Sequence, residues 1–315
     1  MQQPTISIVV PAYNEDPVIE MTHRRLSDVM QASGESYEII YVDDGSRDNT
    51  LPILKRIADA DAHVVVLSFS RNFGQQAANT AGLRQSRGRA VVLIDADLQD
   101  PPEVIPEMIQ KWRSGADVVY GVRKSRKGES LFKKITSWGY YRVFKFLSNS
   151  NAPLDTGDFR LMDRSVVDVL NGMSEHNRYI RGIVNWVGFT QVPVEFVREE
   201  RAAGETKYDL KRMLSLANDG IVGFSMKPLT MAWRLGLIVL LGTLGYFIWQ
   251  LVRAIGGQLV TGMALAMGGV YLLIAVILIL LGLMGSYIGR IYEEAKARPL
   301  YIIDETYSKE GFIDG

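Results

Sequence analysis

The chain has 315 residues, no net formal charge and 47% hydrophobic residues, enough for one substantial domain and a further apolar region. It contains no cysteine, which excludes disulfide bonds, thiol catalysis and Cys-ligated zinc or iron–sulfur sites. Its three histidines are scattered and its charge is balanced, which argues against a His-rich metal centre and against a general nucleic-acid binder.

Short apolar runs alternate with helical patterns from residue 6 to residue 121. Alternation of this kind requires crossover connections and favours a mainly parallel sheet, so the sequence predicts an α/β domain. We predict strands at 6–10, 38–42, 64–69, 90–94 and 118–120, with helices near 16–32, 49–60, 74–86 and 102–114.

Polar clusters follow four of these strands, at 11–15, 43–46, 71–74 and 95–97. Ligands of parallel α/β sheets bind beyond the carboxyl ends of the strands, so these loops are expected to form one site. The chain has neither a G-x-G-x-x-G nor a G-x-x-x-x-G-K-[ST] motif, which removes the main support for nicotinamide-type and P-loop sites.

Two carboxylates, Asp95 and Asp97, follow directly on the apolar run 91–94. Burying unpaired carboxylates is costly, and no Lys or Arg lies within several residues of them, so a divalent cation is the natural partner. Oxygen ligands suit Mg²⁺ or Mn²⁺, with a substrate diphosphate completing the coordination. The alternative is a solvated acidic loop after a core strand.

Two uncharged runs, 235–252 and 259–288, approach or exceed the roughly 20 residues that cross a bilayer. We expect them to be transmembrane helices; the alternative is a buried helical hairpin. The positive-inside rule predicts that both termini are cytoplasmic, because basic residues flank the pair while the connecting loop holds only Arg253. These flanking residues are Lys227, Arg234, Arg290, Lys296 and Arg298.

Two further segments, 130–147 and 207–224, combine apolar and basic residues in patterns typical of helices at the membrane interface. Packing beneath the catalytic sheet is the alternative. The run 300–303 has strand character and would be a hazardous free edge, so we expect it to dock on the α/β domain, either its own or that of a neighbouring chain. Small residues in the spans favour helix pairing between chains, which predicts a homo-oligomer, a dimer or a tetramer.

The polar loops resemble those of family-2 glycosyltransferases of the GT-A fold, and most of all the polyprenyl-phosphate sugar synthases. The Gln-x-x-Arg-Trp signature of the processive polysaccharide synthases is absent. The resemblance covers nearly the whole chain and implies a GT-A domain over 1–206, an interfacial region over 207–228, two transmembrane helices within 229–289 and a cytoplasmic tail over 290–315. The motifs are Ile-Val-Val-Pro-Ala-Tyr-Asn-Glu at 8–15, Tyr-Val-Asp-Asp-Gly-Ser at 41–46, Arg-Asn-Phe-Gly at 71–74, Asp-Ala-Asp-Leu-Gln-Asp at 95–100, Asp-Thr-Gly-Asp-Phe-Arg-Leu at 155–161 and Gly-Glu-Thr-Lys-Tyr at 204–208.

The resemblance also implies how a nucleotide sugar is held. Pro11, Tyr13 and Glu15 would frame the base and ribose, with Asn72 as a further substrate-binding residue. One of Asp43 and Asp44 would accept a hydrogen bond from the pyrimidine, while the other caps the following turn; the sequence does not separate them.

In the same way, the resemblance implies that Asp95, Asp97 and Gln99 hold the metal, which neutralises the leaving diphosphate. Asp158 is the implied catalytic base, with Asp155 as the nearby alternative. A phosphate acceptor is already largely dianionic at neutral pH, so the alternative is that Asp158 positions Arg160 or the metal-bound phosphate.

Basic residues near the membrane region are implied to clamp the diphosphate or the acceptor phosphate. They are Lys207, which we count with Asp97 and Asp158 as catalytic, together with Arg123 and Arg126. Attraction to lipid headgroups is the alternative for these basic loops.

The function that follows is an inverting transfer of glucose from UDP-glucose to undecaprenyl phosphate on the cytoplasmic face of a membrane. The enzymatic alternative uses GDP-mannose and dolichyl phosphate. The non-enzymatic alternative is an inactive, transferase-like membrane scaffold.

Overall fold

The computed structural model describes residues 3–123, 156–175, 178–197, 263–309 and 311–312, with short stretches between 237 and 256. The chain divides into two units. One comprises Met1–Ser137, Ser150–Leu210 and Arg298–Gly315, and the other comprises Trp138–Asn149 and Lys211–Ala297. The segments 130–147 and 207–224 lie outside the described residues, so the interfacial helices stay a prediction.

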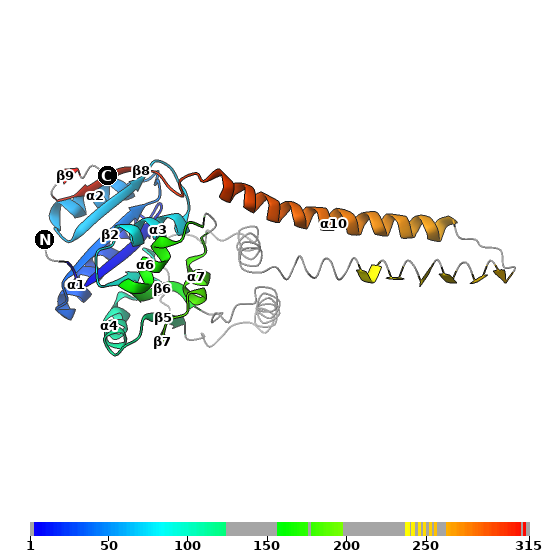
Figure 1. Ribbon diagram of the computed structural model, residues 1–315. Helices are drawn as coiled ribbons and strands as arrows, with labels where there is room; N and C mark the ends of the chain where they lie inside the picture. Colours follow the sequence, from blue (N-terminus) through cyan, green and yellow to red (C-terminus); the bar gives the residue numbers. More distant parts are fainter. Residues whose placement is uncertain are drawn as a thin grey trace. The chain divides into compact units, whose positions relative to one another are not determined.

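The first unit is built on one sheet with the strand order β7-β5-β6-β4-β1-β2-β3-β8-β9 (Figure 1). Its centre, β4-β1-β2-β3, is entirely parallel, which confirms the predicted α/β class. The strands are β1 (Ile6–Ala12), β2 (Tyr37–Asp43), β3 (Val64–Phe69), β4 (Ala90–Leu93), β5 (Val118–Arg123), β6 (Thr156–Asp163), β7 (Gln191–Phe196), β8 (Ile303–Ser308) and β9 (Gly311–Phe312).

The helices that follow β1 to β4 lie where the sequence predicts them, whereas the two helices within 164–186 were not predicted. One group of contacting helices is α1, α2 and α4; a second is α3, α6 and α7. Their bounds are α1 (Ile19–Ser33), α2 (Thr50–Ala60), α3 (Gln75–Gln85), the short 3₁₀ helix η1 (Pro102–Val104), α4 (Ile105–Arg113), α6 (Arg164–Gly172) and α7 (Ile180–Trp186).

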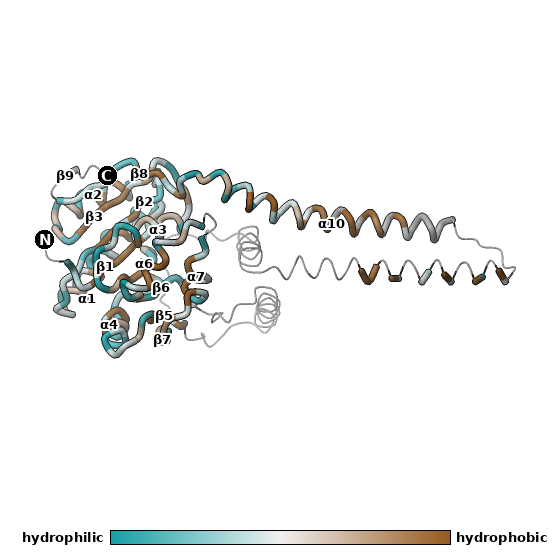
Figure 2. The backbone as a smooth tube through the Cα atoms, viewed as in Figure 1, coloured by the Kyte–Doolittle hydropathy of each residue, from teal (hydrophilic) through white to brown (hydrophobic). Residues whose placement is uncertain are grey.

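Alternation of side chains along β1 directs the packing on the two faces of the sheet. Ile6, Ile8 and Val10 are buried in the cluster that includes residues of α1, α2 and α4. Val9 points to the other face, where a Cβ on Gly82 of α3 would lie 2.2 Å from its Cγ1. Because of this close approach, α3 lies tightly against β1. Figure 2 shows the apolar colouring concentrated in the strands of this core.

The sequence did not predict β6, which lies antiparallel between β4 and β5. This strand carries Gly157, Asp158 and Arg160, and only Phe159, Leu161 and Met162 of its eight residues are apolar, so its apolar signal is short. Its position next to β4 brings the second acidic motif beside the first.

The C-terminal tail docks on its own domain, where β8 pairs antiparallel with β3 and covers that edge. Tyr301 stacks on Phe69 at 5.1 Å between ring centroids, and the Tyr307 hydroxyl donates to Asp59 at 2.5 Å. Lys55 and Glu305 form an ion pair. The predicted docking is therefore confirmed, although the strand begins at Ile303, where the predicted run ends. The homo-oligomer stays a prediction.

In the second unit, α10 (Met263–Lys296) is a helix of 34 residues. Within the part of the chain that the structure describes, no helix is long and apolar enough to cross a membrane. The two transmembrane helices expected from the sequence are therefore not confirmed.

Removing the tail strands should destabilise the sheet. Truncation after Arg298 exposes the unpaired backbone groups of β3, so we expect a lower midpoint of chemical denaturation and faster aggregation. Truncation after Phe312, which keeps β8 and β9, is the matched control. Equal denaturation midpoints for the two truncated chains would show that β8 adds nothing to the stability of the domain.

Candidate active site

The loops after β1 and β2 are joined by hydrogen bonds at the carboxyl edge of the sheet. The Asn14 backbone N–H donates to Ser46 Oγ at 3.0 Å, and the Arg47 N–H donates to Asn14 Oδ1 at 2.8 Å. Asn14 adopts a left-handed φ of 53°. The predicted residues Pro11, Tyr13 and Glu15 are half-buried along this loop, so they line the edge where ligands of such sheets bind.

Asp44 anchors the loop that follows β3. Its carboxylate accepts hydrogen bonds from the backbone N–H groups of Phe73 and Gly74 at 2.6 and 2.9 Å. The side chain of Asn72 donates to the Asp44 carbonyl at 3.2 Å. Both oxygens of this carboxylate are thus used within the protein, which makes Asp44 a support for the 71–74 loop.

Gly45 allows the same loop to approach closely. It has a φ of +65°, and a Cβ there would lie 2.5 Å from the carbonyl carbon of Arg71. A side chain at this position would therefore meet both backbone strain and a steric clash.

Asp43 differs from its neighbour, because one of its oxygens is left without a partner. Oδ2 accepts from the Ser46 N–H at 3.3 Å and from Ser68 Oγ at 3.5 Å. Oδ1 is buried and has no hydrogen-bond partner among the described residues. Burial raises the pKa of Asp43 above its ordinary value, and the hydrogen bonds from Ser46 only partly offset it. This oxygen is an available acceptor for a ligand N–H.

Asp95 has a strongly raised pKa. Burial, followed by repulsion from Asp158, Asp100 and Asp97, raises the pKa of Asp95 to about 8. Its Oδ1 accepts a hydrogen bond from Gln75 Nε2 at 2.7 Å. Negative charge is therefore incompletely compensated at the end of β4.

The remaining predicted metal ligands lie on the turn after Asp95. Leu98 has a left-handed φ of 58°, and the Gln99 backbone N–H donates to Asp97 Oδ1 at 3.1 Å. Among the described residues, no group of three or more acidic or histidine side chains lies close enough to hold a metal ion.

Asp158 enters the site from β6 and forms an ion pair with Arg181. The Arg181 Nε lies 3.2 Å from Asp158 Oδ1, and Gln76 Nε2 lies 3.5 Å from Oδ2. Burial alone would raise the pKa of Asp158, but the charges of Arg181 and Arg160 outweigh it and hold that pKa below its ordinary value.

Arg160 does not bind the Asp158 carboxylate directly. Its guanidinium donates to the backbone carbonyls of Asp158 and Gly157, at 3.2 and 3.0 Å. Burial lowers the pKa of Arg160 to about 10, against the opposing effect of Asp158. Arg160 therefore stabilises the backbone at the start of β6, and its positive charge acts on the Asp158 carboxylate without a direct hydrogen bond.

Arg123 forms an ion pair in the acidic cluster, which consists of Asp95, Asp97, Asp100 and Asp158. Its Nη2 lies 3.4 Å from the buried Asp100, and a Cβ on Gly157 would lie 2.8 Å from the same nitrogen. The predicted residues Arg126, Asp155 and Lys207 lie outside the described residues, so their placement stays a prediction.

Sequence reasoning missed Gln75, Gln76 and Arg181. The two glutamines follow the 71–74 motif directly, so their position was a usable signal. Arg181 lies on α7 and approaches Asp158 only through the fold, and no pattern in the sequence marks it.

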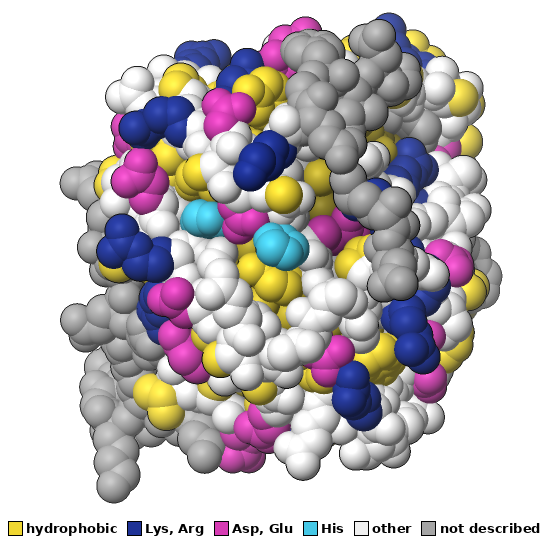
Figure 3. All heavy atoms as spheres, turned by 90° about the vertical axis from the view of Figure 1, so that its left-hand side faces the viewer, with side chains coloured by type: hydrophobic (Ala, Val, Ile, Leu, Met, Phe, Trp, Pro, Cys, Tyr) yellow, Lys and Arg dark blue, Asp and Glu magenta, His cyan; other side chains and the backbone are white. Residues whose placement is uncertain are grey.

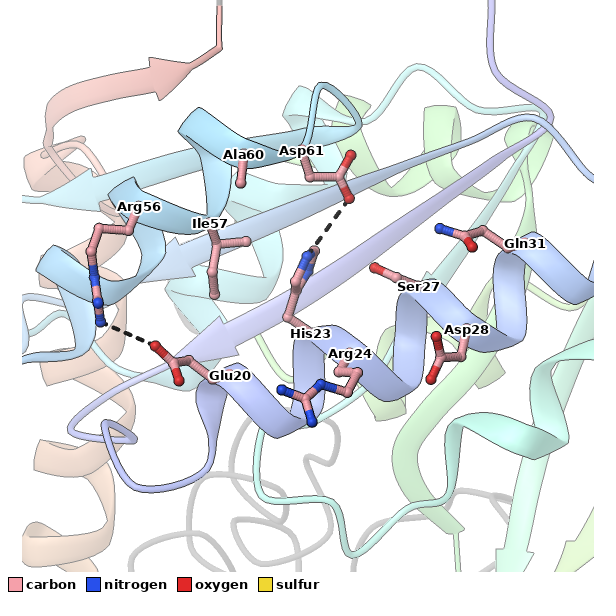
Figure 4. Close-up of a pocket in the computed structure, with 10 residues that line it drawn as sticks. All are labelled: Glu20, His23, Arg24, Ser27, Asp28, Gln31, Arg56, Ile57, Ala60 and Asp61. Carbon is pink, nitrogen blue, oxygen red and sulfur yellow. Dashed lines mark hydrogen bonds and ion pairs between the residues drawn. The ribbon is translucent and has the colours of Figure 1, made fainter.

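A separate hollow of about 430 Å³ lies between α1 and α2 (Figure 4). Four of the side chains that line it form pairs: Glu20 with Arg56 at 3.0 Å, and His23 with Asp61 at 3.6 Å. Figure 3 shows the histidines of this face beside an acidic side chain. Because these charges are already paired, the carboxyl edge of the sheet is the better candidate site.

Residues 7–170 match the model of glycosyl transferase family 2, and the chain belongs to this family. It is a glycosyltransferase, as the following relatives also indicate. An uncharacterised glycosyltransferase of Bacillus subtilis (strain 168) is 49% identical, over 96% of this chain and 94% of the relative. A prophage bactoprenol glucosyl transferase homolog of Escherichia coli (strain K12) is 40% identical, over 95% and 98%.

A bactoprenol glucosyl transferase of Shigella phage SfV is 39% identical, over 96% of this chain and 99% of the relative. Among solved structures, glucosyl-3-phosphoglycerate synthase from Mycobacterium tuberculosis, in complex with Mn²⁺, UDP-glucose and phosphoglyceric acid, is 21% identical with a TM-score of 0.47. The match covers 70% of this chain and 78% of that one.

Replacement of Asp43 and of Asp44 by the isosteric asparagine should change the free energy of unfolding in different directions. Asp44→Asn places an amide N–H against a backbone donor, and one unsatisfied buried group costs about 1–3 kcal/mol of unfolding free energy. Both changes remove a buried charge, but Asp43→Asn can place its amide nitrogen where Oδ1 has no partner among the described residues, so its stability at neutral pH should equal or exceed that of the unmodified chain.

Chemical denaturation at pH 5 and pH 8 tests this pair. Because the folded-state pKa of Asp43 is raised, the folded chain binds its proton more tightly than the unfolded chain, and stability from this group is lost as pH rises. The gain from Asp43→Asn should therefore be larger at pH 8. Equal losses in both variants would contradict the assignment of Asp44 as the loop anchor.

Proposed function

We propose that the protein transfers glucose from UDP-glucose to undecaprenyl phosphate, giving a lipid-phosphate-linked sugar. The observation that carries the proposal is the 39–40% identity, over nearly the full length, to proteins named bactoprenol glucosyl transferases. The polar loops at one edge of the sheet support it, together with the carboxylates of Asp95, Asp97, Asp100 and Asp158. A nucleotide diphosphate and a sugar offer groups complementary to these loops and, through a cation, to these carboxylates.

The donor base fits the side of the site formed by β1 and β2. Oδ1 of Asp43 would accept the pyrimidine N–H, which would satisfy a buried oxygen that has no partner among the described residues. Asp44 holds the 71–74 loop beside it. Tyr13 and Glu15 on the β1 loop would contact the base and ribose.

A divalent cation, Mg²⁺ or Mn²⁺, fits the end of β4. Asp95 and Asp97 supply hard oxygen ligands, and the pKa of Asp95 is raised first by burial and then by neighbouring negative charge, both of which a bound cation would offset. Mg²⁺ is commonly held by one or two carboxylates with substrate phosphates completing the shell, so a third acidic ligand is not required. When bound, such a cation neutralises charge on the leaving diphosphate.

Asp158 is better suited to positioning than to taking a proton. A carboxylate whose pKa is held below its ordinary value by Arg181 and Arg160 is a weak base. The acceptor phosphate, with a second pKa of about 6, is already largely dianionic at neutral pH and needs no base. We infer that Asp158 fixes Arg181, whose guanidinium faces the acidic cluster, for contact with a phosphate.

A donor and acceptor panel tests the reaction. Purified protein is incubated with radiolabelled UDP-glucose, UDP-N-acetylglucosamine or GDP-mannose and with undecaprenyl or dolichyl phosphate, and the lipid is extracted and counted. Label should enter undecaprenyl phosphate from UDP-glucose. Incorporation from GDP-mannose into dolichyl phosphate alone would favour the mannosyltransferase alternative, and no incorporation from any donor would favour the scaffold.

Transfer should depend on a divalent cation. EDTA should abolish it, and Mg²⁺ or Mn²⁺ should restore it, because the diphosphate and the carboxylates repel one another without a cation. Asp97→Ala should keep the unfolding midpoint of the unmodified chain and lose activity, whereas Asp168→Ala, on the exposed side of α6, should keep both. Full activity in chelator would remove the metal from the proposal.

We further propose that the chain is anchored in the membrane with both termini in the cytoplasm. The support is the two uncharged runs, 235–252 and 259–288, and the basic residues that flank them. The acceptor is itself a membrane lipid, so an anchored enzyme would meet it without extraction.

Because the chain has no cysteine, single cysteines report topology directly. Gln258→Cys should react with an impermeant thiol reagent in intact cells, and Glu310→Cys should react only after the membrane is opened. The reverse pattern would overturn the orientation.

A further inference from the structure

Two adjacent glutamines at the start of α3 each reach a different acid of the site. Gln75 Nε2 donates to Asp95 Oδ1 at 2.7 Å, and Gln76 Nε2 lies 3.5 Å from Asp158 Oδ2. Asp95 follows β4 and Asp158 lies on β6, so the two acids come from segments far apart in the chain. Two neighbouring side chains of the first turn of α3 therefore contact both Asp95 and Asp158.

Helix geometry explains why Gln75 and Gln76, although adjacent in sequence, contact two different carboxylates. Successive residues are rotated by about 100° around the axis, so adjacent side chains diverge and reach separate points. The helix itself is held firmly, because Gly82 brings α3 against Val9 of β1. The amides thus extend from a helix that packs closely on the sheet.

Gln76 makes a second contact that adds to its hold on Asp158. Its Oε1 accepts the backbone N–H of Ile180 at 3.0 Å. Ile180 is the first residue of α7, and the next residue, Arg181, bonds the other oxygen of Asp158 at 3.2 Å. One amide group thus contacts the carboxylate and the helix that carries its ion-pair partner.

We propose that Gln75 and Gln76 are positioning residues with separate tasks: Gln75 orients Asp95 toward the divalent cation, and Gln76 fixes the Asp158–Arg181 pair. The proposal rests on the proposed function. Neutral amides suit these tasks because they donate hydrogen bonds without adding charge to a crowded acidic cluster. The two side chains set the spacing between the cation-binding acid and the phosphate-directed pair.

The test compares Gln75→Met and Gln76→Met, with Gln85→Met, exposed at the last turn of the same helix, as the matched control. Mn²⁺ binding in the presence of UDP is followed by electron paramagnetic resonance, and kcat and KM are measured at saturating Mn²⁺. Gln75→Met should raise the dissociation constant for Mn²⁺ about 10-fold, the effect expected for loss of a group that orients a metal ligand.

Gln76→Met should leave Mn²⁺ binding unchanged and lower kcat at least about 10-fold, because misplacement of a phosphate-directed group mainly affects turnover. Gln76→Glu serves as a second variant: it keeps the acceptor for Ile180 and removes the donor toward Asp158, so it should lower kcat while α7 stays in place. Gln85→Met should match the unmodified chain in every measurement.

Unchanged Mn²⁺ binding in Gln75→Met, or equal effects of the two substitutions on Mn²⁺ binding, would overturn the division of tasks. A Gln76→Glu variant with full kcat would overturn the role toward Asp158. If no donor of the panel is used by the unmodified chain, the proposed function fails on that result, and the Mn²⁺ measurements alone then decide the positioning proposal.

Discussion

The concentration of carboxylates at one edge of the sheet is the constraint on which the rest of the site depends. Asp97, Asp100 and Asp158 all raise the pKa of Asp95, after the larger effect of its burial. Such a cluster is tolerable only if most of its charge is compensated. Arg123 pairs with Asp100 and Arg181 with Asp158, whereas Asp95 has a neutral amide. The remaining negative charge is concentrated at the position where a cation would bind.

The sequence was sufficient to predict the framework of this edge. Buried parallel strands read as continuous apolar runs, and β1 to β4 were all placed within a few residues by that signal. The polar loops at their ends follow from the topology alone. The tail strand was also predictable, because a run such as 300–303 needs a partner, yet its pairing with β3 could not be read from local pattern.

What the sequence could not supply was the pairing of side chains across distant segments. Asp43 and Asp44 are adjacent and chemically identical. Only the fold shows that Asp44 accepts hydrogen bonds from the backbone of the 71–74 loop, while Oδ1 of Asp43 has no partner among the described residues. Strand β6 was missed because only Phe159, Leu161 and Met162 of its eight residues are apolar, which leaves a short signal. Arg181 was missed for a related reason, since its partner is 23 residues away on another element.

The two acids that the glutamines connect are pushed in opposite directions by their surroundings. Burial and neighbouring carboxylates raise the pKa of Asp95 to about 8, while two arginines lower the pKa of Asp158 despite its burial. Groups whose environments separate their pKa values in this way usually have different tasks. Asp95 is suited to holding positive charge from outside the protein, and Asp158 to remaining ionised and fixing an arginine. Both acids are contacted from one turn of α3, so a small movement of that helix would alter the two tasks together. The close packing of α3 against β1 at Gly82 opposes such a movement.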